Sequence, residues 1–349
     1  MSLNNSKGGR LCGTSGGVLP KTTHDRARPC MVLVQPGKAC QILRISERTR
    51  SATALTYVQR VNLAIDHIVG HLGEPLRLRE LARVAMLSPF HFHRVFQALI
   101  GSTPAEFVLR LRLEKALGLL YLPRPPSLTA IALACGFSSS SDFSRSFKRR
   151  FGIAPSAFDL EAWRRSHGAE LSAIVEQAAA HPHVERLPPR HNPDSFRVRI
   201  RELPARTVAY IRVDRPYQGD RAMKAVGRLL AWAERNGLAN GQWLGYQWDN
   251  PEITSLEDCQ YYVAVTAERF TPRGEVGRYR FPPMTVAEVT IRGGLDLELR
   301  ALQWFYGSWL PRSGFVPDDQ PAFEAWIGRP LAHGTAYFEL AVQLPIRRA

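Results

Sequence analysis

Two short stretches of the sequence could present hydrogen-bond donors on one face of a helix. In the first, Ser88 and Pro89 predict a helix start, and large apolar residues recur from Phe92 onward with a helical period. The opposite face of that helix carries Phe90, His93, Arg94 and Gln97. The matching face of the second stretch carries Ser140, Ser141, Ser144, Arg145, Lys148 and Arg149. Arginine can donate two hydrogen bonds to guanine, and short hydroxyls can reach bases or phosphates, so both faces favour contact with DNA.

The two stretches belong to copies of one unit. Six residues of the first copy recur 51 positions later, namely Phe92, Arg94, Phe96, Gly101, Pro104 and Phe107. Upstream the offset is 50 and equates Ser88 with Ser138, which indicates one inserted residue at the turn. Residues 53–165 therefore predict two helix–turn–helix units joined by a long helix over about 103–121. The alternative is an all-α bundle whose arginines are merely exposed.

The basic residues are concentrated in the first half of the chain. Of the net charge of +15, residues 1–56 carry +7, residues 57–165 carry +7 and residues 166–349 carry +1. Such an asymmetry points to a polyanionic partner for the first half. Residues 1–52 are rich in Gly, Ser, Thr, Arg and Pro, which predicts a mostly disordered basic extension. This extension is either a basic arm or the product of a start site placed too far upstream.

Several classes of protein are disfavoured by composition. The sequence has no apolar run of the roughly 18 residues that a membrane helix needs, and its first residues lack the apolar segment of a secretory signal. The five scattered cysteines include no C-x-x-C pair, which argues against a disulfide framework and a zinc site. No nucleophile–base pair or phosphate loop stands out. We therefore expect a cytoplasmic, nucleoid-associated protein with no catalytic residues, no metal, no cofactor and no membrane partner.

Two motif stretches support a more specific interpretation of the helical segment. They are "LARVAMLSPFHFHRVFQALIGSTPAEF" and "IALACGFSSSSDFSRSFKRRFGIAPSAF". With them, residues 57–163 resemble the DNA-binding domain of AraC/XylS transcription regulators. The resemblance implies docking in successive major-groove segments, with base-facing residues Phe90, His93, Arg94, Ser140, Ser141, Ser144 and Arg145. One departure is Asp159, which stands where the family has a phosphate-contacting arginine, so we expect weaker binding to the DNA backbone.

The second half of the chain predicts a different fold. Residues 166–196 are interpreted as a linker, because their later part is polar and rich in proline. Beyond it, segments of strand and helix periodicity recur at an offset of 77–78, for example Thr207 with Thr285 and Trp232 with Trp309. Residues 197–347 are thus predicted to be an α+β domain of duplicated β-α-β-β units, which follows an all-α double helix–turn–helix domain in a multidomain chain.

A candidate small-molecule site follows from this duplication. The offset of 78 equates Tyr246 with Glu324, in strands rich in Trp and Tyr. A carboxylate within an aromatic cleft suits an organic cation, although a solvated Glu beside a structural aromatic core is the alternative. The expected effector-binding residues are Tyr246, Trp248, Trp304, Tyr306, Glu324 and Trp326.

The stretches "DNPEITSLEDCQYYVAV", "WLPRSG", "PAFEAW" and "FELAVQLPI" also give residues 197–347 a family resemblance. They resemble the GyrI-like effector-binding domain that follows AraC-type domains in Rob, and this resemblance implies that Glu324 lies in the ligand cleft. The sequence therefore predicts a transcription regulator that binds double-stranded promoter DNA and a small, amphipathic cationic effector, with RNA polymerase as a further candidate partner. Two alternatives stay open for the second domain, a protein-docking scaffold and a small-molecule hydrolase.

Overall fold

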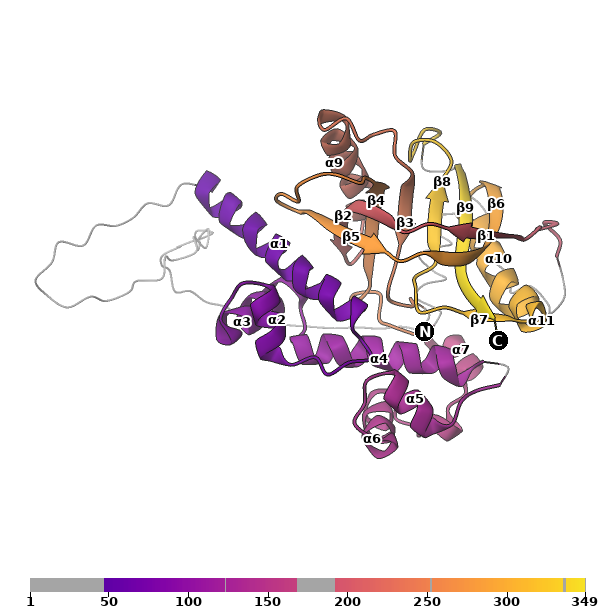
Figure 1. Cartoon of the computed structure of the whole chain (residues 1–349). Coiled ribbons are helices and arrows are strands. Elements are labelled where there is room, and N and C mark those ends of the chain that lie inside the picture. The colour runs from indigo at the N-terminus through magenta and orange to yellow at the C-terminus, as the bar shows by residue number, and fades with distance from the viewer. Residues whose placement is uncertain (1–46, 123, 168–191, 252, 335–336, 349) are drawn as a thin grey trace, which may run out of the picture. The chain divides into compact units, whose positions relative to one another are not determined.

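The computed structural model describes residues 47–348 except 123, 168–191, 252 and 335–336 (Figure 1). The expected extension over residues 1–52 and the expected linker over residues 166–196 therefore lie largely outside the described residues. Residues 46–349 belong to one compact unit. The first helix begins at Glu47, so the expected start of the helical domain at residue 53 falls inside that helix.

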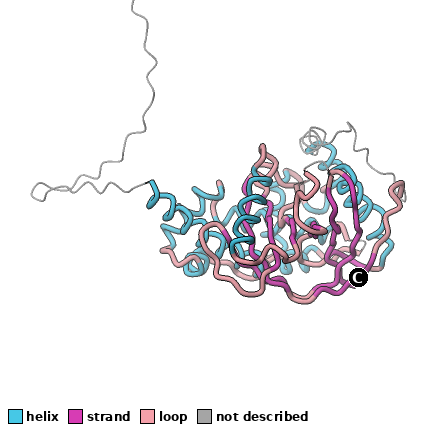
Figure 2. The backbone as a smooth tube through the Cα atoms, turned by 90° about the horizontal axis from the view of Figure 1, so that it is seen from above, coloured by secondary structure: helices cyan, strands magenta, loops and turns pink. Residues whose placement is uncertain are grey.

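Between residues 47 and 167, the described residues of the first half form helices and the turns that join them, as the apolar periodicity predicts. Figure 2 separates its helices from the strands of the second half by colour. The described elements are α1 (Glu47–Gly70), α2 (Leu78–Val84), α3 (Pro89–Ile100), α4 (Pro104–Leu120), α5 (Leu128–Ala134), α6 (Ser140–Phe151), the 3-10 turn η1 (Pro155–Ala157) and α7 (Leu160–His167).

The ends of the two copies are set by the same local chemistry. Ser88 caps α3, where its hydroxyl accepts the backbone N–H of His91, and Ser139 caps α6 in the same way. The prediction that Ser138 corresponds to Ser88 was therefore wrong by one residue, because the inserted residue precedes the cap. Both helices end at a glycine in the left-handed region, Gly101 at φ 87° and Gly152 at φ 76°.

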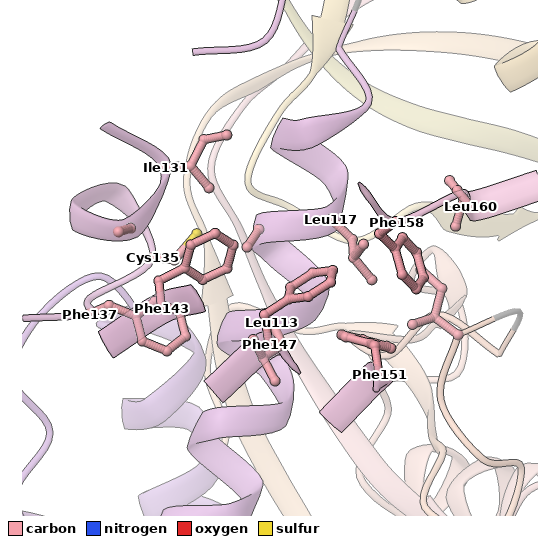
Figure 3. Close-up of a cluster of buried hydrophobic side chains, with 13 residues drawn as sticks. Leu113, Leu117, Ile131, Cys135, Phe137, Phe143, Phe147, Phe151, Phe158 and Leu160 are labelled. Atoms are coloured by element: carbon pink, nitrogen blue, oxygen red, sulfur yellow. The ribbon is translucent and has the colours of Figure 1, made fainter. Parts of the chain in front are cut away.

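Each helix–turn–helix unit has its own core, and α4 contributes to both. Phe107 and Leu111 pack with Phe92 and Phe96 in the first core. In the second core, Leu113 and Leu117 of α4 lie with the aromatic side chains of α6 and with Phe158 (Figure 3). The first turns of α4 pack in one core and its later turns pack in the other. The length of α4 therefore sets the distance between the two units.

In the described part of the second half, nine strands form one antiparallel sheet. Along the sheet the order is β1-β6-β9-β8-β3-β4-β2-β5, with β7 paired to β9 (Figure 1). The order is symmetric about the β3–β8 pair, which confirms the predicted duplication. The strands are β1 (Arg199–Leu203), β2 (Arg206–Asp214), β3 (Trp243–Tyr246), β4 (Gln260–Thr266), β5 (Val276–Phe281), β6 (Met284–Gly293), β7 (Phe315–Pro317), β8 (Phe323–Trp326) and β9 (Phe338–Arg348).

The sheet has one face that its own helices cover and one that they do not. The covering helices are α9 (Arg221–Arg235) and α10 (Leu295–Trp304), which continues through the π-helical turn η2 (Phe305–Trp309) into α11 (Leu310–Ser313). Beneath α9 lie residues such as Val263 and Trp243, and beneath α10 lie residues such as Val342. The other face carries a buried aromatic cluster that we call the open-face cluster: Tyr210, Tyr246, Tyr262, Phe281 and Phe323.

Candidate DNA-contacting helices and effector site

The structure places the predicted polar face of α3 on the surface. Arg94 and Gln97 are exposed and His93 is half-buried, while Phe92 and Phe96 on the opposite side are fully buried. Phe90 is 73% exposed, and the guanidinium of Arg94 lies 5.7 Å from the centre of its ring. This is a weak cation–π contact between exposed side chains, and it favours conformations in which Arg94 lies over Phe90.

The polar face of α6 is exposed in a similar way. Ser141, Arg145, Lys148 and Arg149 are exposed, and Ser140 and Ser144 are half-buried. Lys148, Arg149 and Arg150 occupy the last turn, where the negative end of the helix dipole favours cations. All ten residues predicted to contact DNA therefore lie on α3 or α6, and none of them belongs to the buried cores.

Asp159 has a structural role that the sequence did not reveal. Its carboxylate accepts the backbone N–H of Ala162 at 3.0 Å, which caps the N-terminus of α7. The side chain itself is exposed. An arginine at this position could not accept that hydrogen bond, so the aspartate provides a helix cap that an arginine would not.

Glu324 lies on the helix-covered face of the sheet and is held there by a tyrosine. Its register partners are Gly245 on β3 and Val342 on β9. The hydroxyl of Tyr261 on β4 donates to Oε2 of Glu324 at 2.5 Å. Both groups occupy the space above Gly245, where an added Cβ would lie 1.8 Å from the tyrosine oxygen and 2.5 Å from the glutamate oxygen. Only glycine at position 245 leaves room for this pair.

A second carboxylate makes the surroundings of Glu324 unfavourable for negative charge. Glu298, in the first turn of α10, is only 7% exposed. Burial raises the pKa of Glu298 well above its ordinary range, and the charge of Glu324 raises it further. Burial also raises the pKa of Glu324, against the lowering effect of its hydrogen bond with Tyr261. A bound cation would favour the ionised form of either group.

The structure does not bring the six expected effector-binding residues together. Tyr246 pairs with Phe323, the neighbour of Glu324, and side chains of directly paired residues share a face. Tyr246 is therefore on the open face, and Trp248 packs there against Phe281 and Tyr279. The expected single cleft that joins them to Glu324 was wrong, because alternate residues of a strand point to opposite faces and the offset of 78 does not preserve the face here.

The remaining expected residues lie on the helix-covered side or at the surface. Trp326 contacts the cores beneath both helices, and Trp304 packs on Phe196. Tyr306 is 44% exposed. Two surface hollows of about 320 and 350 Å³ contain none of the six residues.

Sequence reasoning missed the groups that surround Glu324. These are Tyr261, Glu298 and Gly245. Tyr217 and Gln247 lie nearby, and the hydroxyl of Tyr217 is hydrogen-bonded to the side-chain amide of Gln247. The charge of Glu324 contributes to the raised pKa of Tyr217, after the larger effect of burial. The sequence did contain a signal for Tyr261, because strand alternation places it on the face opposite to Tyr262. To conclude that Tyr261 meets Glu324, one also needs to know that β3 lies between β4 and β8 in the sheet.

Comparison with known proteins matches each half of the chain separately. Residues 81–160 match a family model described as "Helix-turn-helix domain", and residues 196–347 match one described as "GyrI-like small molecule binding domain". In the described part of the chain, no helix is both long and apolar enough to cross a membrane.

Individual relatives agree with this division. The "Probable transcriptional regulator LumQ" of Photobacterium leiognathi is 37% identical over 105 residues, which is 30% of this chain and 42% of that protein. The chain spans less than half the length of the first curated regulators it matches. A "DNA gyrase inhibitor" of Edwardsiella piscicida is 31% identical over 163 residues, which is 44% of this chain and 100% of that protein.

A solved structure similar to the helical half is an AraC-type transcriptional regulator from Chromobacterium violaceum, at 32% identity over 28% of this chain and 86% of that one, with a TM-score of 0.26. The sequence matches determine the family of the second half. The chain belongs to the GyrI-like small molecule binding proteins through this half, and its first half is a helix–turn–helix domain similar to those of AraC-type regulators.

Proposed function

We propose that this protein is a transcription regulator that binds double-stranded DNA through α3 and α6 and a small amphipathic cation near Glu324. The observation that carries the DNA-binding role is the duplicated unit itself. Two helices with exposed polar faces are attached to one rigid helix, α4, whose side chains fill both cores. This arrangement suits recognition helices that enter successive major-groove segments.

The charge of the helical segment supports the same role. Residues 57–165 carry +7, and three cations gather in the last turn of α6. Phosphate contacts from such groups position a protein on DNA, whereas we propose that Arg94 and Arg145, on the exposed faces of α3 and α6, read base edges. We assign Lys148 and Arg149 to the phosphates and the remaining predicted residues to the bases.

DNA binding is tested with genomic fragments that the purified full-length protein selects. Arg94→Ala or Arg145→Ala should weaken binding to a selected fragment by about 1–3 kcal/mol and relax the preference for it over random DNA. Arg149→Ala should weaken binding to both DNAs alike and reduce the salt dependence. Arg235→Ala, which removes an exposed arginine of α9, is the control. An equal loss on selected and random DNA for all three variants of α3 and α6 would show that these helices do not read sequence.

The effector role rests on the buried carboxylate. Burial raises the pKa of Glu324, and its carboxylate has the hydroxyl of Tyr261 as a hydrogen-bond partner. The ionised carboxylate is therefore destabilised, and a bound cation would supply the positive charge that stabilises it. The aromatic side chain of Trp326 lies two residues further on the same face and can contact the apolar part of the ligand. Because Tyr261 fills the space beside Glu324, the ligand must displace the tyrosine hydroxyl.

The effector proposal is tested with Glu324→Gln, which keeps the shape and removes the charge. Binding of benzyltriethylammonium, measured by calorimetry, should weaken by about 1–3 kcal/mol, while binding of a neutral ligand of similar shape stays the same. Glu268→Gln, an exposed carboxylate, is the control. Benzoylcholine, a cation with a hydrolysable ester bond, is expected to be recovered intact after long incubation, and hydrolysis of that bond would favour the hydrolase alternative. Equal cation binding by Glu324→Gln and the parent would overturn the sensor assignment.

A further inference from the structure

The effector domain makes buried polar contacts with α4. Arg110 and Glu114 lie one turn apart on α4, and their side chains are 11% and 8% exposed. Arg110 donates to the carboxylate of Asp249, in the loop that follows β3. The backbone N–H of Asn250 donates to Oε2 of Glu114 at 2.9 Å, and the hydroxyl of Thr254 donates to its Oε1. The middle of the helix that joins the two DNA-binding units is thus bound to one loop of the sheet domain.

A second group of contacts holds α1. The hydroxyl of Tyr210, from the open-face cluster, lies 2.8 Å from both carboxylate oxygens of Asp66. Beside it, Nε of Arg212 donates to Oδ1 of Asn62 at 3.0 Å. Asn62 is 2% exposed, so this contact is closed to solvent.

Apolar side chains complete the contact. Trp248 packs against the core of the first helix–turn–helix unit, and Ile253 is part of the core of the second. The loop after β3 therefore touches both units as well as α4. We call the polar members of these contacts the latch: Asn62, Asp66, Arg110, Glu114, Tyr210, Arg212, Asp249, Asn250 and Thr254.

Buried charges make such a contact cooperative. A carboxylate or guanidinium taken out of water is stabilised only while its partners are in place, and the loss of one partner leaves the others uncompensated. Because Arg110 contacts both Asp249 and Glu114, a shift of the loop after β3 weakens several contacts at once. The latch is thus suited to two states, closed and open.

The latch and the effector site share the same strands. Gly245, directly opposite Glu324, lies on β3 four residues before Asp249. On β4, Tyr261 holds Glu324, and its neighbour Gln260 donates its backbone N–H to Oδ2 of Asp249 at 2.8 Å. A displacement of Tyr261 therefore acts through one peptide bond on a hydrogen bond of the latch.

We propose that the latch couples the Glu324 site to the DNA-binding units, and that a cation bound at Glu324 favours the open latch. This inference rests on the proposed effector function. The ligand takes over Glu324 and displaces the hydroxyl of Tyr261, which moves the ends of β3 and β4 that hold Asp249. Release of α1 and α4 then changes how α3 and α6 are presented to DNA. The coupling is reciprocal, so a weakened latch increases affinity for the cation.

The test uses Glu114→Gln and Tyr210→Phe in the full-length protein. Both substitutions keep the shape of the side chain and remove a latch contact, and neither residue touches Glu324. Benzyltriethylammonium should bind each variant at least about fivefold more tightly than the parent, since the ligand no longer opens the full latch. The matched control is Glu275→Gln, which removes a surface carboxylate paired with Arg228 and should leave cation binding unchanged.

Hydrogen exchange reports the latch itself. Saturating benzyltriethylammonium should lower the protection of the amides in α1 and α4 of the parent and of the Asn250 and Gln260 amides that donate to the latch. Unchanged cation affinity in variants whose latch amides already exchange faster would overturn the coupling, because an open latch would then have no effect on the site.

The failure of the proposed function has a different outcome. If the parent binds no cation, the effector assignment is wrong, and the role of the latch is then tested by DNA affinity alone. In that case Glu114→Gln should still change the affinity for a selected genomic fragment by more than about twofold while Glu275→Gln does not. Equal DNA affinity for both variants and the parent would show that the latch is only a domain contact.

Discussion

Gly245 offers a direct test of how the surroundings of Glu324 are packed. In Gly245→Ala, the added methyl would lie 1.8 Å from the hydroxyl of Tyr261 and 2.5 Å from Oε2 of Glu324, both too close for any carbon. The tyrosine must move, which breaks its hydrogen bond with Glu324. Overpacking costs about 1–3 kcal/mol. Loss of a hydrogen bond to a carboxylate adds roughly 1.5–3 kcal/mol, so we expect a total of about 2.5–6 kcal/mol.

The assay is urea unfolding followed by the fluorescence of tryptophan, including the fully buried Trp243 beside this site. Gly227→Ala is the matched control, because Gly227 is exposed in the middle of α9 and an added Cβ would meet nothing within 4 Å. That substitution should stabilise the protein by about 0.5–1 kcal/mol, the difference in helix propensity. If Gly245→Ala were as stable as the parent and bound benzyltriethylammonium equally well, the close packing of Tyr261 and Glu324 over Gly245 would be refuted.

Three further predictions concern buried or capping groups. Burial raises the pKa of Asp66 to about 8, so its contribution to stability is complete below about pH 4 and is lost progressively as the pH rises to about 8. In that window the free energy of unfolding should fall by at most about 1.4 kcal/mol per pH unit, and Asp66→Asn should reduce the pH dependence of the urea midpoint between about pH 5 and 8. Burial lowers the pKa of Arg206 to about 10, and its Nε and Nη2 are buried without hydrogen-bond partners. Arg206→Met should therefore leave the unfolding free energy unchanged or higher, and a loss above about 1 kcal/mol would contradict this. Asp159→Ala should cost about 1 kcal/mol in a thermal melt through loss of the α7 cap, whereas Asp159→Asn should keep the stability and bind DNA more tightly, because it removes a negative charge.

The sequence by itself determined the local structure and the repeats. Helix starts depend on a few neighbouring residues, so Ser88 and Pro89 were enough to place the start of α3. The exposed faces of α3 and α6 followed from the apolar period alone, since each helix buries only one side. The duplication of the sheet domain was also readable, because equivalent strands keep similar residues at a nearly constant offset.

Tertiary structure decided which of these residues meet. A constant offset does not preserve strand faces, and a difference of one residue placed Tyr246 and Glu324 on opposite sides of the sheet. In the sequence, Asp66, Arg110 and Glu114 resemble the charged positions of any solvated helix. They become buried and paired only because the open face of the sheet packs on α1 and α4, and Tyr210 and Asp249, which bind them, lie more than 130 residues away along the chain. Contacts at that separation depend on how the faces of the two domains pack, and no local pattern in the sequence encodes that packing.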